Sequence, residues 1–137
     1  MGSQAGYEAC RSSWREFANR SQDGSKYFTC HAGLQYVAAP LTDKSGQVGL
    51  FLVGQLYWQE PDPREEAERV RRLAAASELS KENLQEAASD IEVIPPEQQE
   101  KFESWPFTAA RAVNSILHER VGFVERLQKI ANLTQIP

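Results

Sequence analysis

The sequence lacks a long hydrophobic run. Its longest, Val48–Gly54, spans seven residues, whereas a helix that crosses a membrane needs roughly 20. The N-terminus has no basic segment followed by an apolar one, as a secretion signal would, and Gly6 stands where a myristoylation motif has Ser or Thr. We therefore expect a cytoplasmic protein with no membrane segment and no lipid anchor.

An excess of positive charge is also missing. The 137 residues include 15 Lys and Arg against 19 Asp and Glu, which gives a net charge of -4. Such a chain has no general positive field to attract phosphate backbones, so we expect no direct contact with nucleic acid. Hydrophobic residues make up 41% of the chain, which is enough for one folded core and excludes disorder throughout.

Cysteine and histidine are scarce. The two cysteines, Cys10 and Cys30, lie far apart in the sequence, and only Cys30 has a histidine, His31, beside it. A structural zinc site needs four ligands, usually in close pairs, and that spacing is missing. We therefore expect no metal, no cofactor and reduced thiols. A metal or haem sensor that uses Cys10, Cys30 or His31 is kept as an alternative.

Motifs of catalysis are absent as well. The sequence has no phosphate-binding loop, no dinucleotide-binding glycine pattern, no nucleophile elbow and no metalloprotease helix. Neighbouring residues of a strand point to opposite faces, so Cys30 and His31 would not form a nucleophile and base pair. Acidic residues between Asp62 and Arg72 alternate with arginines, which is typical of a solvated helix face. We expect a protein that is not an enzyme.

The first half of the chain predicts one helix and then a small sheet. Apolar residues at helical spacing predict a helix over about Tyr7–Asn19. Strand-forming residues run from Lys26 onward, with a hairpin loop at Thr42–Gly46. The last strand, Gln47–Trp58, is apolar on both alternating faces, so we expect it at the centre of the sheet.

After Pro63 the period changes to that of helices. Asp62 can cap the first of these helices and Pro63 can open it, while Ser80 can cap a second. The segment Ile91–Ile94 alternates and adds one edge strand at most. Pro106 should interrupt the helix that follows. The sequence therefore predicts an α+β fold whose second half is mainly helical.

The C-terminal helix carries an apolar stripe near heptad spacing. Arg120 interrupts this stripe, whose apolar members are Val113, Ile116, Phe123, Leu127 and Ile130. Such a seam predicts a parallel homodimer through this helix, weakened by the arginine. The alternative is a helix that packs wholly on its own domain. We divide the chain into residues 1–105, the folded domain, and residues 106–137, a dimerisation helix.

Aromatic and polar residues are enriched around the predicted sheet. The aromatic candidates for the wall of a pocket are Trp14, Tyr27, Phe28, Tyr36, Phe51, Tyr57 and Trp58, and the polar ones are Thr29, His31, Gln35 and Gln55. Such a mixture fits a small-molecule pocket, although core packing accounts for most of these aromatics equally well. Gln55 favours the pocket more strongly, since an amide inside an apolar strand needs hydrogen-bond partners.

Several short motifs occur in a characteristic order. They are the helix segment Cys10–Arg15, the run Cys30–Leu34, the pair Pro40–Leu41, Gly49, and the pair Gly54–Gln55. In this order they resemble the core pattern of the PocR-type sensory domain. The positions that match best are Cys30, Gly33, Leu34, Pro40, Gly54 and Gln55, with Cys10 upstream.

The resemblance implies a PAS-like antiparallel sheet with flanking helices and a long C-terminal signalling helix. It further implies a bacterial sensory domain that binds a small organic molecule and passes the bound state to a histidine kinase or DNA-binding output module. The chain itself shows no kinase core and no helix-turn-helix pattern. A constitutive dimerisation module without ligand is the alternative. The residues we expect at the ligand are Cys10, Trp14, Phe28, Cys30, His31, Tyr36, Gln55 and Tyr57.

Overall fold

Three antiparallel strands and four helices form the part of the chain that the computed structural model describes, residues 3–133. In chain order they are α1 (Gln4–Ser21), β1 (Tyr27–Thr29), β2 (Gln35–Asp43), β3 (Gly46–Leu56), α2 (Pro63–Ser77), α3 (Lys81–Ser89) and α4 (Pro96–Leu133). The predicted α+β class is confirmed, as are a sheet confined to the first half and a mainly helical second half.

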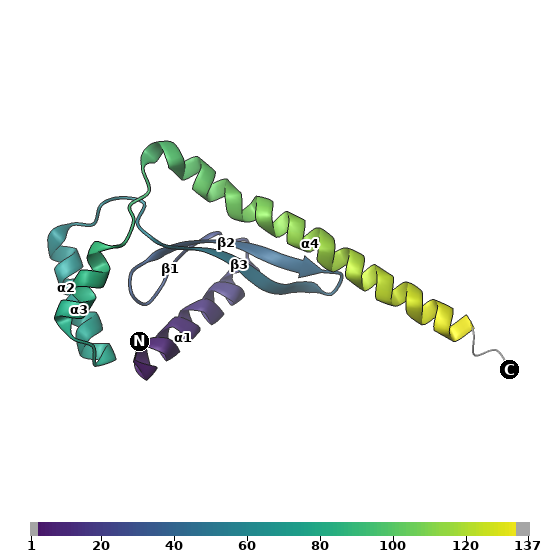
Figure 1. Ribbon diagram of the computed structural model, residues 1–137, viewed down its shortest axis with the longest axis horizontal. Coiled ribbons are helices and arrows are strands. Elements are labelled where there is room, and N and C mark those ends of the chain that lie inside the picture. The colour runs from purple at the N-terminus through teal and green to yellow at the C-terminus, as the bar shows by residue number, and fades with distance from the viewer. Residues whose placement is uncertain (1–2, 134–137) are drawn as a thin grey trace.

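The sheet lies between two helices that run along its opposite faces. Helix α1 covers one face and α4 covers the other, while α2 and α3 pack together beyond one end of the sheet (Figure 1). The hairpin of β2 and β3 points the other way, alongside α4, and α4 continues past its tip. No described helix combines the length and hydrophobicity that crossing a bilayer requires.

Alternation along β2 divides the core between the two faces. On the α1 side, Phe17 stacks on Phe28 with ring centroids 4.7 Å apart, and Tyr36 and Ala38 complete the cluster. On the other side, Val37 lies fully buried beneath α4. Both faces of β2 are therefore excluded from water, and the β-branched and aromatic residues at these positions fit that environment.

The strand predicted to be central is an edge strand. The order in the sheet is β1-β2-β3, so β2 lies in the middle and β3 pairs along only one of its sides. Our prediction was wrong because both faces of β3 are partly covered: Leu50 and Leu52 pack on the Phe17 cluster on the α1 side, and Phe51 packs on Trp105 of α4. A strand between two helical layers is apolar on both faces even when one of its edges is open.

The helix starts agree with the caps expected from the sequence. The Asp62 side chain accepts hydrogen bonds from the backbone N–H groups of Arg64 and Glu65, and Pro63 is the first residue of α2. Ser80 accepts from the N–H of Asn83 at the start of α3. Each cap satisfies backbone donors that the first turn of a helix leaves unpaired.

The predicted break at Pro106 is wrong. Helix α4 continues through this residue as one element of 38 residues. The Pro106 side chain is fully buried against the sheet. Packing on the sheet thus compensates for the backbone hydrogen bond that the proline cannot donate.

The segment before α4 is joined to the end of β3. Tyr57 forms an isolated parallel bridge with Val93, in which the Tyr57 N–H donates to the Glu92 carbonyl and the Ile94 N–H donates to the Tyr57 carbonyl, both over 2.9 Å. This single bridge agrees with the expectation of at most one edge strand here. It ties the α4 start to the sheet end that faces α2.

A single side chain of α4 anchors the β2–β3 hairpin. The Asn114 amide oxygen accepts from the Thr42 N–H over 2.8 Å, and its nitrogen donates to the Pro40 carbonyl over 3.2 Å. Farther out, Lys44 at the hairpin tip pairs with Glu125 at 2.6 Å. The inner face of α4 is therefore used within the domain as far as Glu125.

Candidate functional site

The run Cys30–Leu34 forms a tight loop between β1 and β2. The Cys30 N–H donates to the Leu34 carbonyl and the Gly33 N–H donates to the Cys30 carbonyl, both over 2.9 Å. Gly33 has a φ of 78°, a backbone conformation that a residue with a Cβ adopts only with strain. The glycine of this motif is therefore required by the geometry of the turn.

Arg69 on α2 holds this loop from the side. Its Nη1 donates to the Ala32 carbonyl over 2.8 Å, and its Nη2 pairs with Glu66 at 3.1 Å. A Cβ on Gly33 would lie 2.8 Å from the Arg69 Cδ, so the arginine stem runs directly over the glycine. Only 12% of the Arg69 side chain is exposed, and the sequence pattern, which predicted a solvated face, missed this residue.

A second contact holds the loop from α1. The Ser13 hydroxyl accepts from the His31 backbone N–H over 3.0 Å and donates to the Ala9 carbonyl over 3.1 Å. The His31 side chain itself is exposed, and partial burial lowers its pKa. His31 therefore positions the loop through its backbone, and its ring lies at the surface.

Tyr36 is the centre of five predicted site residues that the structure brings together. Burial raises the pKa of Tyr36, hydrogen bonds with Gln55 and Trp14 oppose this rise, and the thiols of Cys30 and Cys10 add to it. Burial, and after it the Cys30 thiol, raise the pKa of Cys10. Helix α1, the loop and β3 therefore all contribute side chains around one tyrosine.

Gly54 makes room for the Tyr36 ring. A Cβ at Gly54 would overlap the Tyr36 ring and lie 2.5 Å from the Gln35 carbonyl oxygen. The two residues are register partners on β3 and β2. No larger residue fits at position 54, which explains the glycine of the Gly54–Gln55 pair.

We expected Gln55 to be buried within an apolar strand, but the structure shows that it is exposed. It is the extra residue of a β-bulge: Tyr36 pairs with Gly54 and Gln35 with Leu56, so Gln55 has no partner on β2. Its φ is 64° and its side chain is exposed. Near the end of an edge strand the amide can reach both water and Tyr36, so burial of a polar group is not the reason for its presence.

The bulge changes the side to which Tyr57 points. Strict alternation would place Tyr57 on the α4 face with Phe51 and Val53, but one extra residue reverses the order. Tyr57 instead lies under the Arg69 guanidinium, 5.3 Å from it, on the same side as Cys30. Because of the bulge, the Tyr57 side chain lies on the face of the sheet that carries the site.

The hydroxyl of Tyr57 is buried and forms no hydrogen bond of good geometry with the described residues. Only 7% of the residue is exposed. Burial raises its pKa, the Arg69 guanidinium opposes this, and the Glu66 carboxylate reinforces it. The site therefore contains a buried hydroxyl oxygen, that of Tyr57, without a hydrogen bond of good geometry to the described residues.

Three further aromatic candidates are packing residues of the sheet, and one of them, Phe28, shares the cluster of Tyr36. Phe28 is a core residue, 3% exposed and stacked on Phe17. Phe51 packs edge-on against Trp105 of α4, and Tyr27 lies beside Glu103 of the same helix. These side chains serve the packing of the two sheet faces, so the predicted ring of aromatics does not form.

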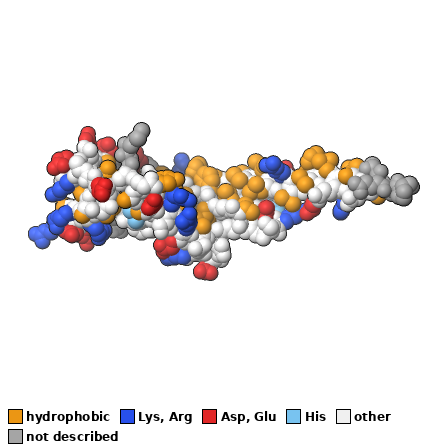
Figure 2. All heavy atoms as spheres, turned by 90° about the horizontal axis from the view of Figure 1, so that it is seen from below, with side chains coloured by type: hydrophobic (Ala, Val, Ile, Leu, Met, Phe, Trp, Pro, Cys, Tyr) orange, Lys and Arg blue, Asp and Glu red, His pale blue; other side chains and the backbone are white. Residues whose placement is uncertain are grey.

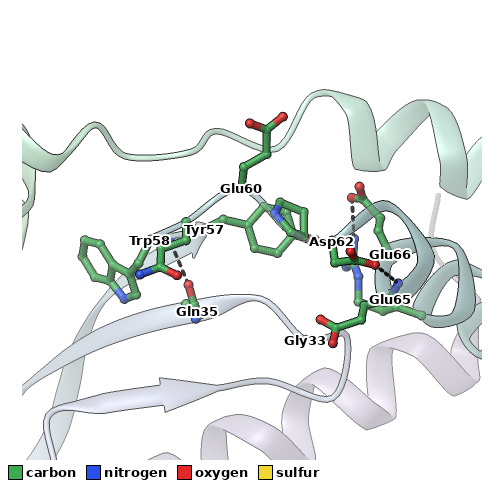
Figure 3. Close-up of a pocket in the computed structure, with 11 residues that line it drawn as sticks. Gly33, Gln35, Tyr57, Trp58, Glu60, Asp62, Glu65 and Glu66 are labelled. Atoms are coloured by element: carbon green, nitrogen blue, oxygen red, sulfur yellow. Dashed lines mark hydrogen bonds and ion pairs between the residues drawn. The ribbon is translucent and has the colours of Figure 1, made fainter.

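Two pockets lie on either side of Arg69. One has a volume of about 360 Å³ and is lined by Ala32, Leu34, Gln55, Arg69, Val70, Leu73, Leu84, Ala87, Ala88, Asp90 and Ile91. The other measures about 530 Å³ and lies between the end of β3 and the start of α2, where Tyr57 points toward Asp62 and Glu66 and the Trp58 ring points away from them (Figure 3). The first is mostly apolar and holds three residues of the short motifs.

Cys10 and Cys30 are free thiols and half-buried. Among residues 3–133 no three side chains of His, Cys, Asp or Glu gather in a way that could hold a metal ion. The chemistry available is therefore that of hydrogen bonding by Gln55, Arg69 and the tyrosines, next to apolar helix walls.

Comparison with known proteins identifies the family. No curated protein and no solved structure shows significant similarity to the chain. A family model, described as the sensory domain found in PocR, matches residues 1–118. That match includes α1, the whole sheet, the loop with its Arg69 contact and the first part of α4. The chain belongs to the family of PocR sensory domains, and its role is that of a sensory domain in signalling.

Proposed function

We propose that this sensory domain binds a small organic molecule in the 360 Å³ pocket beside Gln55. The main support for this proposal is that Ala32, Leu34 and Gln55, which come from motifs far apart in the sequence, line one cavity. Apolar side chains of α2 and α3 close it, and Gln55, Arg69 and Asp90 supply a few polar groups. A largely apolar pocket with few polar groups is the usual form of a small-molecule site.

The connections around Tyr57 support a route from this pocket to α4. Arg69 lines the pocket and stacks on Tyr57. The Tyr57 backbone is bonded to Glu92 and Ile94, and Gln99 in the first turn of α4 donates to the carbonyls of Trp58 and Ile94. A ligand that moves Arg69 would therefore displace the start of α4 and signal to an output module after this helix.

The outer face of α4 supports a parallel homodimer as the carrier of the signal. Most of the predicted seam is exposed, with Ile116, Phe123 and Ile130 between 57% and 65% exposed, whereas Val113 is half-buried beside the domain. Hydrophobic side chains also lie on the part of α4 that extends beyond the sheet (Figure 2). At 3.6 residues per turn these residues lie opposite Asn114, so the seam faces away from the domain.

Ligand binding is tested by native mass spectrometry of the purified chain, followed by melting in a panel of short-chain alcohols, carboxylates and amines. A ligand at a hundred times its dissociation constant adds about 2.7 kcal/mol to the free energy of unfolding. We expect Gln55→Ala to abolish the shift and to leave the fold intact. Full response in Gln55→Ala would show that the ligand lies elsewhere.

The helix pairing is tested by sedimentation. Leu127 is 49% exposed, so Leu127→Lys should leave the melting temperature of the monomer, measured in dilute solution, unchanged while it weakens dimerisation about tenfold, equivalent to roughly 1.4 kcal/mol. A chain that is monomeric at high micromolar concentration before any substitution would refute the α4 dimer. Stoichiometric zinc or haem lost on Cys30→Ser would instead support the metal or haem sensor, and a dimer with no ligand response would support the constitutive module.

A further inference from the structure

The two edges of the sheet differ sharply in how they are protected. Strand β1 has three residues, whereas β3 has eleven. The β3 sequence, GQVGLFLVGQL, contains no charged residue and no proline. Proteins usually protect a long edge strand with such residues, with a covering segment or with a partner strand. A strand of this length and composition is therefore unusual as a free edge.

The hydrogen bonds of β2 show which backbone groups of β3 point outward. On β2 the Ala38 N–H donates to the Lys26 carbonyl. The Thr42 N–H and the Pro40 carbonyl form hydrogen bonds with the Asn114 side chain. The backbone N–H and C=O groups of even-numbered β2 residues therefore point away from β3. The odd residues therefore bond to β3, where their partners are Gly49, Phe51 and Val53. The even residues Leu50 and Leu52 therefore present their N–H and C=O groups to the open edge. Val48 lies at a second irregularity, since Leu41 pairs with Gly49 and Thr42 with Gln47.

The β3 sequence is partly symmetric about Phe51. Around Phe51 it reads Leu50 and Leu52, then Gly49 and Val53, then Val48 and Gly54, then Gln47 and Gln55. If two copies pair antiparallel about Phe51, each leucine faces a leucine and each branched valine faces a glycine. Side chains directly opposite each other are the unit of sheet stabilisation, so this alignment is complementary from position 49 to position 53.

We propose that β3 pairs antiparallel with β3 of a second copy of this chain, centred on Phe51, to form a continuous six-stranded sheet. In this register Leu50 bonds with the second copy's Leu52 and Leu52 with its Leu50, which uses the outward N–H and C=O groups identified above. The two Phe51 residues then form a non-hydrogen-bonded pair on the two-fold axis, with Cα atoms about 4.5 Å apart. The irregularities at Val48 and Gln55 limit the regular pairing to residues 49–53 of each strand.

This contact is separate from the proposed α4 dimer. Antiparallel pairing of β3 needs a two-fold axis perpendicular to the sheet, whereas parallel pairing of α4 needs an axis along the helix. One chain therefore makes the two contacts with different neighbours. Each contact can be removed without the other, so the failure of one proposal leaves the other intact.

Disulfide trapping tests the register. In a chain with Cys10→Ala and Cys30→Ala, Phe51→Cys should form an intermolecular disulfide on mild oxidation, because Cα atoms within about 4.4–6.8 Å can be bridged. Val48→Cys is the control: Val48 is 51% exposed, but its counterpart in the second copy is six residues away along the strand, roughly 20 Å. We expect Phe51→Cys to give at least about ten times more covalent dimer than Val48→Cys. The same difference should remain when Leu127→Lys is added to remove the α4 contact. Equal cross-linking of the two, or none from a folded Phe51→Cys, would overturn the proposal.

A second measurement does not depend on the Phe51 side chain. In the Leu127→Lys background, Val48→Lys should weaken the remaining self-association about tenfold in sedimentation. Tyr27→Lys is the matched control, because Tyr27 is 52% exposed but lies on the opposite edge strand, β1. We expect Tyr27→Lys to leave self-association unchanged. Equal effects of the two lysines, or a monomer before either is introduced, would show that β3 does not pair with itself.

Discussion

Arg69 on α2 donates a hydrogen bond over 2.8 Å to the carbonyl oxygen of Ala32, in a loop 37 residues earlier in the chain. The same guanidinium pairs with Glu66 and lies over the Tyr57 ring. One side chain therefore joins the α2–α3 pair to the loop and to the end of β3. Because Arg69 lines both pockets, any molecule that enters either one meets this connection first.

Arg69→Ala should lower the free energy of unfolding by about 1.5–3 kcal/mol, because it removes a charged hydrogen bond to the loop and leaves Ala32 without its partner. Chemical denaturation measures this. The matched control is Arg71→Ala on the same helix, whose pair with Glu68 is more than 60% exposed on both sides and should contribute less than about 0.5 kcal/mol. Equal losses in the two variants would show that Arg69 does not hold the loop.

Gln55→Gly should separate stability from ligand response. A glycine relieves the positive φ of 64°, so we expect the free energy of unfolding to rise by about 0.5–1 kcal/mol. The amide is lost, so the melting shift with ligand should disappear. Glu78→Gly is the control, because Glu78 has a φ of 58° at the end of α2 and should gain stability while it keeps the ligand response. Loss of the response in both variants would contradict the role of Gln55.

Gly54→Ala should be among the most damaging small substitutions in the chain. The added Cβ would meet the Tyr36 ring and the Gln35 carbonyl, and such overpacking costs about 1–3 kcal/mol. At Gly49, on the same strand, the nearest atom to an added Cβ is Leu41 Cδ1 at 3.7 Å. Gly49→Ala should therefore be tolerated. Thermal melts compare the stability of the two variants. Similar melting temperatures would contradict the packing of Tyr36 over Gly54.

Tyr57→Phe should raise the free energy of unfolding at neutral pH by about 1 kcal/mol, because the buried hydroxyl lacks a good partner. Tyr36→Phe should not raise it, since the Tyr36 hydroxyl lies next to the polar side chains of Gln55 and Trp14. Denaturant titrations compare the two. A loss of stability in Tyr57→Phe would indicate that the hydroxyl has an effective partner, with Glu66 the nearest candidate.

Tyr57 should also make the free energy of unfolding depend on pH in the alkaline range. Burial raises the pKa of Tyr57 in the folded state, so the folded protein holds the phenolic proton more tightly than the unfolded chain does. The resulting stability is complete below the unfolded value of about 10 and is lost as pH rises through the folded pKa. We expect the free energy of unfolding to fall above about pH 10, less steeply in Tyr57→Phe. Identical slopes would contradict this.

Local chemistry was sufficient to predict many of the elements. Side-chain caps and turn residues act over a few positions, so Asp62, Pro63 and Ser80 marked helix starts correctly, and the period of apolar residues separated the sheet from the helical half. The order of short motifs also identified the family. These signals depend on neighbouring residues and hold in any tertiary context.

Only the tertiary structure decided the position of β3, the face of Tyr57 and the role of Arg69. Apolar alternation cannot distinguish a central strand from an edge strand between two helices, because both place apolar side chains on two faces of the sheet. A bulge at Gln55 reverses the faces after it, and its positive φ leaves no mark in residue type. Arg69 matches a solvated helix face by sequence, and its burial follows from the approach of a loop 37 residues away, which no local pattern encodes.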